Sequence, residues 1–330
     1  MKCYFVVNPA AGKGKLQEGL EVNIKEACSA KNIEYEIYRT TARYDAERYV
    51  KSVCENGEGG EKRFFLCGGD GTLSEGVNGA VGYSGVGCGV IPIGTGNDFV
   101  RNFANKEKFL DVSAQIEGTL SPVDLIKYGD RYCVNMVNIG FDCKVVEYLA
   151  DIKKNPVIPG KLAYVAGVLK AFMRMPGVKP TVSFEDEEGE KLDLMLICIA
   201  NGAFCGGGFK SAPYIALDDG RMNVSTVRRL NRLDFARLIG SYKTGTYVNE
   251  GTVKYIDYAS CGKVTVDIGE ESFVCVDGEL EKHRSITFGI EKGVLPFVVP
   301  KGAEMTKNPV FPALPNCREL EKRQPSGREA

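Results

Sequence analysis

The chain has 330 residues, of which 44% are hydrophobic and 26% are charged, and this balance excludes a disordered protein. Its formal net charge is −1, so no overall positive field favours nucleic acid as a partner. No apolar run reaches the roughly 18 residues of a membrane-spanning helix. The twelve cysteines form no Cys-x-x-Cys pair, so we expect free thiols in a cytoplasmic protein that has no zinc site.

The first third of the chain alternates short apolar runs with helical periodicity, which predicts an α/β domain with a parallel sheet. The predicted strands cover residues 4–7, 33–38, 64–67 and 86–93. The predicted helices cover residues 16–28, 46–53 and 73–80, with Asp45 as the N-cap of the second. Ligands of such sheets bind at the carboxyl ends of the strands, where the glycine-rich turns of this chain fall.

From residue 123 onward the pattern changes to many short strands separated by turn residues, which predicts a mainly antiparallel β-sandwich. Two helical segments, residues 162–173 and 233–244, interrupt it. We therefore expect a nucleotide-binding α/β domain at 1–122, a β-rich lipid- and metal-binding domain at 123–294, and a flexible tail at 306–330. The predicted strands cover residues 123–127, 131–139, 181–184, 192–200, 222–227, 263–268, 272–276 and 285–289.

Two glycine-rich turns carry the strongest functional signal. Residues 68–74 (Gly-Gly-Asp-Gly-Thr-Leu-Ser) and 92–99 (Pro-Ile-Gly-Thr-Gly-Asn-Asp-Phe) each follow an apolar strand. Glycines let backbone N–H groups approach an anion, and a strand-to-helix turn directs them at a phosphate. The acids Asp70 and Asp98 suggest a metal-assisted phosphate site, although either could simply cap the helix that follows it.

The turn at Asn8-Pro9-Ala10-Ala11-Gly12 precedes two lysines, Lys13 and Lys15. It is neither a Walker A motif, because no Ser or Thr follows a lysine, nor a Rossmann fingerprint, because Gln17 stands at the third glycine position. The remaining alternatives are a phosphate-binding turn and an ordinary strand–helix turn with solvated lysines.

Two further turns lie in the second domain. Three consecutive glycines, Gly206 to Gly208, follow a predicted buried strand and suggest close approach of a ligand or a mobile loop. Asp218 and Asp219 precede Gly220, and adjacent carboxylates in such a turn can bind Mg²⁺. An Asp-Asp-Gly β-turn is common, however, and the residues alone favour it.

Asp277-Gly278-Glu279 separates two strands and predicts a two-residue hairpin, or else a site in which Glu279 is a general base. The chain has a single histidine, His283, so acid–base chemistry must fall to carboxylates.

Two basic stretches are best explained as solvated faces. The more specific alternative is that they attract anionic lipid head groups. Their members are Lys153, Lys154, Lys161, Lys170, Arg174 and Lys179, and then Arg228, Arg229, Arg232, Arg237 and Lys243.

Taken together, these segments resemble the soluble bacterial diacylglycerol kinase family, which is related to sphingosine and ceramide kinases and more remotely to NAD kinases. The resemblance runs from about residue 2 to 300. It rests on the order and spacing of the motifs at residues 8–12, 68–72, 92–99, 138–142, 206–208, 217–220 and 277–279.

The resemblance implies ATP and Mg²⁺ as cofactors and a C-terminal strand at 295–305 that completes the first domain. It implies Mg²⁺ held by the Asp219 side chain and the carbonyls of Ala216 and Arg221, with Asp218 close by, and Glu279 as proton acceptor. Arg43-Tyr44-Asp45 departs from the family pattern, in which Gly often precedes the Asp, so Thr40 is a less secure nucleotide contact. The implied nucleotide contacts, including turn residues inferred above, are Asn8, Pro9, Ala10, Ala11, Gly12, Thr40, Gly68, Gly69, Asp70, Gly71, Thr72, Leu73, Ser74, Thr95, Asn97 and Asp98.

We therefore predict a Mg²⁺-dependent transfer of the ATP γ-phosphoryl group to the hydroxyl of diacylglycerol or a related lipid, giving a phosphatidic acid-type product. Asp70 and Glu279 are the predicted catalytic residues, and Lys13 or Lys15 would offset the developing charge. A lipid substrate implies peripheral contact with the inner face of the membrane. The alternatives are a ceramide, sphingoid-base or NAD kinase and a non-catalytic lipid or nucleotide sensor. A homodimer is compatible with the sequence, which does not determine the oligomeric state.

Overall fold

The computed structural model describes residues 1–14, 19–56, 59–153, 167, 169–307 and 310–320. The predictions for Lys15, Lys154, Lys161 and most of the segment 162–168 lie outside these residues, as do the side chains of Lys13 and Lys153. None of the described helices is both long enough and apolar enough to cross a bilayer.

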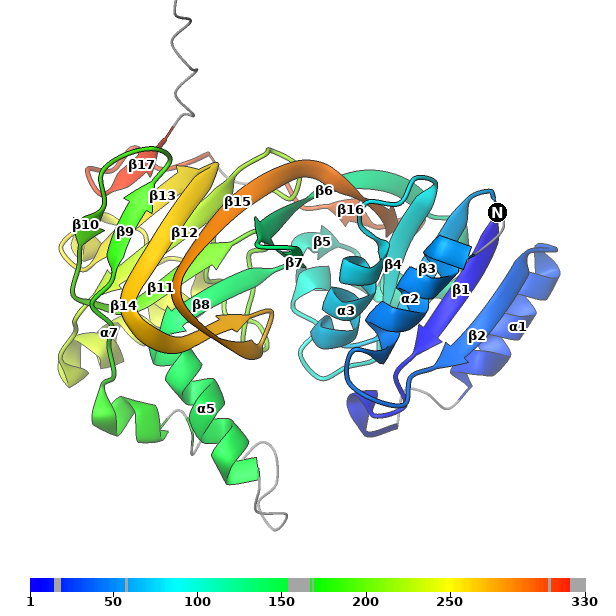
Figure 1. Ribbon diagram of the computed structural model, residues 1–330, viewed down its shortest axis with the longest axis horizontal. Helices are drawn as coiled ribbons and strands as arrows, with labels where there is room; N and C mark the ends of the chain where they lie inside the picture. Colours follow the sequence, from blue (N-terminus) through cyan, green and yellow to red (C-terminus); the bar gives the residue numbers. More distant parts are fainter. Residues whose placement is uncertain (15–18, 57–58, 154–166, 168, 308–309, 321–330) are drawn as a thin grey trace, which may run out of the picture.

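An α/β half and a β-rich half lie side by side, joined by long strands that cross between them (Figure 1). The α-helices are α1 (Leu20–Ala30), α2 (Asp45–Asn56), α3 (Asp70–Ala80), α4 (Val112–Ile116), α5 (Phe141–Lys153) and α7 (Arg232–Thr244). The 3-10 helices are η1 (Ala11–Gly14), η2 (Phe99–Asn102), η3 (Lys106–Leu110) and η4 (Glu250–Thr252).

The strands of the first half are β1 (Lys2–Val7), β2 (Glu34–Arg39), β3 (Lys62–Gly68), β4 (Val86–Pro92) and β5 (Phe103–Ala104). The later strands are β6 (Thr119–Tyr128), β7 (Arg131–Cys133), β8 (Met136–Gly140), β9 (Thr181–Phe184), β10 (Glu190–Lys191), β11 (Leu194–Ala200), β12 (Met222–Arg228), β13 (Ile256–Cys261), β14 (Lys263–Val276), β15 (Glu279–Val299), β16 (Glu304–Met305) and β17 (Cys317–Glu319).

In the first half, β2, β1, β3 and β4 pair in parallel, which confirms the predicted parallel sheet. Buried side chains alternate between its two faces, so Phe64 and Leu66 pack into one core while Phe65 and Cys67 pack into the other. Helices cover both faces, so the inner strands β1, β3 and β4 are mostly buried, whereas the edge strand β2 is partly exposed and carries charged residues. The carboxyl ends of all four strands therefore meet along one edge of the sheet.

The second half is a mainly antiparallel sandwich, as predicted. Strand β14 belongs to both of its layers: the register shifts between Asp267 and Ser272, the part before the shift pairs with β9, and the end of the strand pairs with β8. The sequence suggests two separate strands here, because the polar residues at 269–271 look like a turn, whereas the structure has one bent strand. Val137, Ile139, Val264 and Phe288 are among the fully buried residues between the layers.

Strand β15 runs from the sandwich into the first domain, where Phe297 pairs with Cys88 of β4. Over the same stretch β15 pairs with β6, so two neighbouring strands connect the halves (Figure 1). Phe297 is fully buried and contacts the rings of Phe99 and Phe103. These contacts give the two halves a shared core.

Two local expectations differ from the structure. Asp45 is the first residue of α2, and its carboxylate accepts hydrogen bonds from the N–H and the hydroxyl of Thr41, so the predicted N-cap is wrong. Within the expected flexible tail, β17 pairs in parallel with β13. Asn316 supports it, because its side chain is buried and donates to the Ile256 carbonyl.

Candidate active site

The two glycine-rich turns after β3 and β4 touch each other. The Gly94 N–H donates to the Gly68 carbonyl at 3.1 Å. A Cβ atom added at Gly94 would lie 2.4 Å from the Gly69 Cα, so a side chain there would separate the turns. Glycine at this position therefore sets the close approach that places two sets of backbone N–H groups at one edge.

The turn after β1 joins the same edge. Gly12 has a φ of +59°, and a Cβ there would lie 2.1 Å from the Ile93 carbonyl oxygen. The Asn8 amide donates to the Thr72 hydroxyl at 3.0 Å, which ties this turn to the start of α3. Three segments far apart in the sequence thus form one polar surface.

The Asp70 side chain supports the neighbouring turn at residues 92–99 rather than its own helix. Its carboxylate oxygens accept the N–H groups of Asp98 and Phe99, both at 3.1 Å. The N-cap of α3 is Gly69, so the simple capping explanation for Asp70 does not hold. Helix α3 begins beside these turns and adds the positive end of its dipole to them.

Asp98 links the first domain to the triple-glycine loop. Its Oδ2 accepts the Gly207 N–H at 2.9 Å, and its Oδ1 lies 3.2 Å from Arg101 Nε. It makes no side-chain capping bond to η2. Burial raises its pKa, an effect that the Gly207 hydrogen bond opposes.

The hairpin between β14 and β15 reaches the same edge from the second domain. Asp277 and Gly278 both have positive φ, of 48° and 89°, as expected for a two-residue turn. The Asp277 carboxylate accepts the N–H groups of Val134, Asn135 and Met136, and also the Ser74 hydroxyl at 3.0 Å. Asp277 therefore fixes the hairpin and ties it to α3.

Glu279 follows this hairpin and is half exposed. Its Oε2 lies 2.5 Å from Arg43 of the first domain. The Arg43 guanidinium in turn lies 4.7 Å from the centre of the Tyr44 ring. Tyr44 adopts a φ of 60°, a conformation that favours glycine. The departure noted in the sequence thus supplies an aromatic platform for Arg43.

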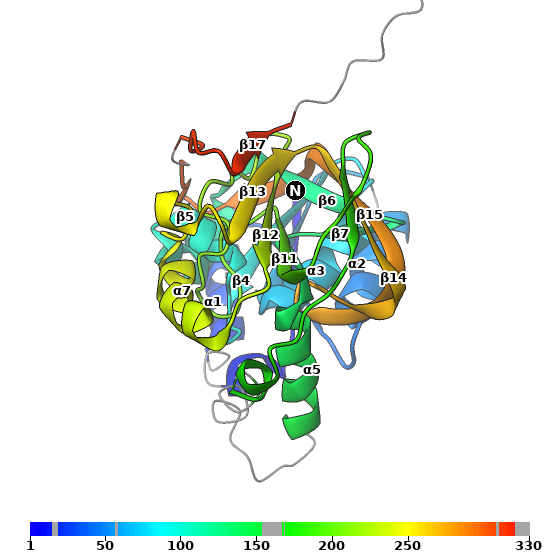
Figure 2. The same ribbon diagram turned by 90° about the vertical axis from the view of Figure 1, so that its left-hand side faces the viewer.

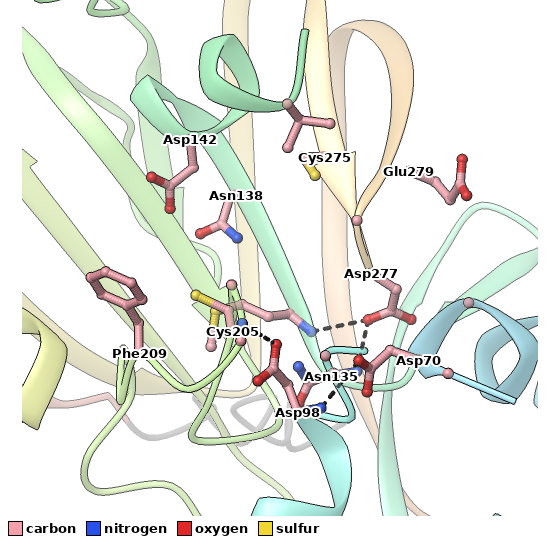
Figure 3. A pocket seen from close by; sticks show the side chains of 18 of the residues that line it. Asp70, Asp98, Asn135, Asn138, Asp142, Cys205, Phe209, Cys275, Asp277 and Glu279 are labelled. Carbon is pink, nitrogen blue, oxygen red and sulfur yellow. Dashed lines mark hydrogen bonds between the residues drawn. The ribbon is translucent and has the colours of Figure 1, made fainter. Parts of the chain in front are cut away.

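A single cavity of about 960 Å³ joins these elements (Figure 3). Gly68, Ser74 and Asn97 support the turns without lining it. The predicted site residues that line it are Asn8, Pro9, Ala10, Ala11, Gly12, Thr40, Gly69, Asp70, Gly71, Thr72, Leu73, Thr95, Asp98 and Glu279.

The cavity continues into an apolar chamber between the β-sandwich and helices α5 and α7, which lie at one end of the sandwich (Figure 2). This chamber was not anticipated, because its walls come from strands and helices whose apolar residues look like ordinary core. Its lining residues include Phe141, Val145, Met195, Leu196, Val227, Leu230, Phe235, Leu238, Ile239, Tyr247 and Ile256.

The predicted metal-binding turn lies elsewhere: none of Ala216, Asp218, Asp219 and Arg221 lines the cavity. Burial of the carboxyl group raises the pKa of Asp219 to about 6, although the residue as a whole remains exposed at the surface. Its Oδ1 accepts the Arg221 N–H at 2.9 Å.

The fully buried Asp124 side chain of β6 supports the turn that contains Asp219. It accepts the N–H groups of Gly220 and Gly293. Across the described ranges, no three His, Cys, Asp or Glu side chains are grouped as metal ligands.

Sequence reasoning missed several polar residues of the cavity. Arg43 was noted only as a departure from a pattern, and Asn138 and Asp142 only as part of a motif. Asp277 drew attention as a turn residue, yet an Asp with positive φ beside Gly is a signal that its side chain is committed to local hydrogen bonds.

The arrangement is an α/β domain joined to a β-sandwich domain, with one cavity that has glycine-rich turns at one end and an apolar chamber at the other. Residues 2–128 match the model of the diacylglycerol kinase catalytic domain, and residues 135–299 match that of the YegS C-terminal NAD kinase beta sandwich-like domain. The chain belongs to the diacylglycerol kinase and YegS family of lipid kinases, which confirms the resemblance recognised in its motifs.

Relatives agree with this placement. The chain is 27% identical to the diacylglycerol kinase of Bacillus subtilis over 286 residues, which cover 83% of this chain and 88% of the relative. A Staphylococcus epidermidis protein that is named as a lipid kinase is 30% identical, over 73% of this chain and 78% of the relative. A crystal structure of a diacylglycerol kinase from Bacillus anthracis has a TM-score of 0.67 at 21% identity, over 90% of this chain and 96% of that chain, and so shares the fold.

Proposed function

We propose that this protein transfers the γ-phosphoryl group of ATP to a hydroxyl of a lipid such as diacylglycerol, giving a phosphatidic acid-type product. The observation that carries the proposal is the cavity itself, which joins the glycine-rich turns to an apolar chamber. A volume near 960 Å³ is at the upper end for small-molecule sites and leaves room for the reacting ends of two substrates.

The glycine-rich turns would hold the triphosphate. The turns at Gly69 and Gly94 bring backbone N–H groups together at the start of α3, an arrangement that favours anions. Within the described residues, Arg43 is the only Lys or Arg side chain that lines the cavity. We infer that it offsets charge on the transferred phosphoryl group in the role first expected of Lys13 or Lys15.

Glu279 would take the proton of the acceptor hydroxyl. It lines the cavity close to the turns, and the Arg43 pair keeps it oriented before substrates bind. Asp70 would act chiefly as a positioning residue, because both of its oxygens already hold the turn at Asp98 and Phe99. Phosphoryl transfer depends on such positioning more than on covalent chemistry.

The Asp219 turn fits Mg²⁺ on its donor chemistry. A carboxyl group with a raised pKa, one oxygen of which accepts no hydrogen bond from a described residue, suits a site that a divalent cation would complete. Asp219, the carbonyls of Ala216 and Arg221, and the neighbouring Asp218 would hold the ion. When bound, Mg²⁺ would supply positive charge that stabilises this turn against β6 and β15, away from the cavity.

The lipid would be reached at a membrane surface. Leu233 of α7 and, on the helical segment at 169–174, Leu169 and Met173 are 70%, 54% and 56% exposed. Lys170 and Arg174 lie on the same segment. Exposed apolar side chains beside basic ones are typical of peripheral contact with anionic lipids. Phe172 of the same segment contacts Phe235 of α7, which lines the apolar chamber.

The test is a phosphoryl-transfer assay with γ-labelled ATP, Mg²⁺ and mixed micelles that contain diacylglycerol, monoacylglycerol, ceramide or sphingosine. Label should appear in a lipid on thin-layer chromatography and should be absent with the Glu279→Gln variant. Label in added NAD⁺ instead would support NAD kinase activity, and label in no acceptor would refute the kinase proposal.

A further inference from the structure

Asp142 occupies the part of the cavity that the phosphate-binding turns do not explain. Strand β8 carries Asn138 and ends at Gly140, whose φ is +97° and whose added Cβ would lie 2.5 Å from the Met195 carbonyl oxygen. The chain can therefore enter α5 only in close contact with β11. Asp142 and Asn138 both line the cavity, apart from Asp70 (Figure 3), and Phe141 and Val145 on the same helix as Asp142 line the apolar chamber.

The Asp142 carboxylate has no partner among the described residues, since no hydrogen bond or ion pair reaches it there. The residue is partly exposed because the cavity reaches it, but protein atoms surround the carboxyl group, and this burial raises its pKa to about 6. An ionised carboxylate enclosed without a donor is costly to the fold.

Asn138 has the same deficit. It is 8% exposed, and its Oδ1 is buried without a hydrogen-bond partner in the described part of the chain. The thiols of Cys205 and Cys275 also border this space and are weak donors whose own pKa values burial raises. Two unsatisfied acceptors therefore meet at the neck of an apolar chamber.

These groups point to a ligand that is apolar at one end and donates hydrogen bonds at the other. We propose that Asp142 and Asn138 form a head-group subsite that selects a lipid with a second donor, a hydroxyl or an ammonium group, in addition to the hydroxyl that is phosphorylated. Monoacylglycerols and sphingoid bases carry such a donor. Diacylglycerol does not, because its other two glycerol oxygens are esterified. The proposal rests on the proposed lipid kinase function and narrows its substrate.

The first test compares kcat/KM for dioleoylglycerol, monooleoylglycerol and sphingosine in the wild type and in Asp142→Asn. Replacing a charged acceptor by a neutral one should reduce kcat/KM for the second-donor lipids by about tenfold or more and change that for dioleoylglycerol by less than about threefold. Comparing sphingosine with monooleoylglycerol shows whether the subsite prefers an ammonium or a hydroxyl group as the second donor. A matched control is Glu147→Gln. Glu147 lies on the same helix as Asp142, but it pairs with Lys144 and does not line the cavity.

The second test needs no turnover. Binding of fluorescent analogues of the three lipids is measured without ATP in the wild type, Asp142→Asn and Glu147→Gln. Weaker binding of the second-donor lipids to Asp142→Asn alone would support the subsite even if no phosphoryl transfer were found. Equal binding of all three lipids by the wild type and Asp142→Asn, or a wild-type preference for diacylglycerol in both assays, would overturn it.

Discussion

The two ends of the cavity treat their acidic side chains in opposite ways. At the end formed by the glycine-rich turns, Asp70 accepts two backbone N–H groups and Asp277 accepts three. At the apolar end, Asp142 accepts none from the described residues. Aspartate therefore supports the backbone at one end of the cavity, whereas at the other end its carboxylate has no partner among the described residues.

This difference distinguishes acids that stabilise the fold from acids whose position suggests a function. A carboxylate that receives several backbone N–H groups satisfies buried donors and stabilises the fold. One that is enclosed without donors destabilises the fold, and positions that break local rules in this way tend to be functional. Substitutions of the two kinds should therefore change stability in opposite directions.

Glu279→Gln is expected to have the largest effect. Loss of a general base lowers kcat by about a hundredfold or more. Stability should hardly change, because the pair with Arg43 is half exposed and such pairs contribute at most about 1 kcal/mol. Initial rates at saturating ATP and lipid, together with a thermal melt, measure both quantities. Turnover near the wild-type rate would exclude Glu279 as the base.

Asp277→Asn should cost the most stability. An amide presents one acceptor oxygen where the carboxylate presents two, so at least one buried N–H of residues 134–136 loses its partner, and the free energy of unfolding falls by about 2–4 kcal/mol. Urea denaturation measures this loss. Asp267→Asn is a control, since Asp267 is exposed and accepts one N–H, from Gly269. Equal effects of the two substitutions would contradict the scaffold role.

Asp142→Asn should instead stabilise the protein. The folded-state pKa of Asp142, about 6, lies above its ordinary value of 3.8, so the folded state binds the proton more tightly than the unfolded state. Stability is therefore lost as the pH rises from about 4 to 6, and the full penalty is present above pH 6. The variant should exceed the wild type by about 1–3 kcal/mol at pH 7.5 and match it below pH 4. A less stable variant at pH 7.5 would show that Asp142 has a structural partner.

Much of the fold follows from local patterns in the sequence. Strand runs that end in glycines predict the parallel sheet and the meeting of the turns at 68–74 and 92–99, because parallel strands present their carboxyl ends at one edge. The bend of β14 and the crossing of β15 depend on pairings with strands more than a hundred residues away, such as β8 and β6, which periodicity does not reveal.

The candidate site likewise has one part that the sequence predicts and another that it does not. Glycine-rich segments that directly follow apolar strand runs indicate turns at the strand ends, so the turns at 68–74 and 92–99 could be found from the sequence. Whether an acid has donors around it is a property of packing, and the isolation of Asp142 is invisible in the motif that contains it. Arg43 likewise reaches Glu279 across 236 positions of sequence.

Asp219 combines features of the two kinds of acid, and the expected effect of its ligand on stability is the smallest of those predicted here. One oxygen accepts the Arg221 N–H, while burial raises the pKa to about 6, an effect that the Arg221 hydrogen bond and charge only partly oppose. Mg²⁺ competes with the proton for this carboxylate, so millimolar Mg²⁺ should raise the free energy of unfolding by about 1 kcal/mol at pH 7.5 and by less at pH 5. Calorimetry of the wild type and Asp219→Asn at both pH values measures it. If Mg²⁺ stabilises Asp219→Asn as much as the wild type, the ion binds elsewhere. Asp219 would then resemble Asp142, as a carboxylate that is enclosed with too few donors.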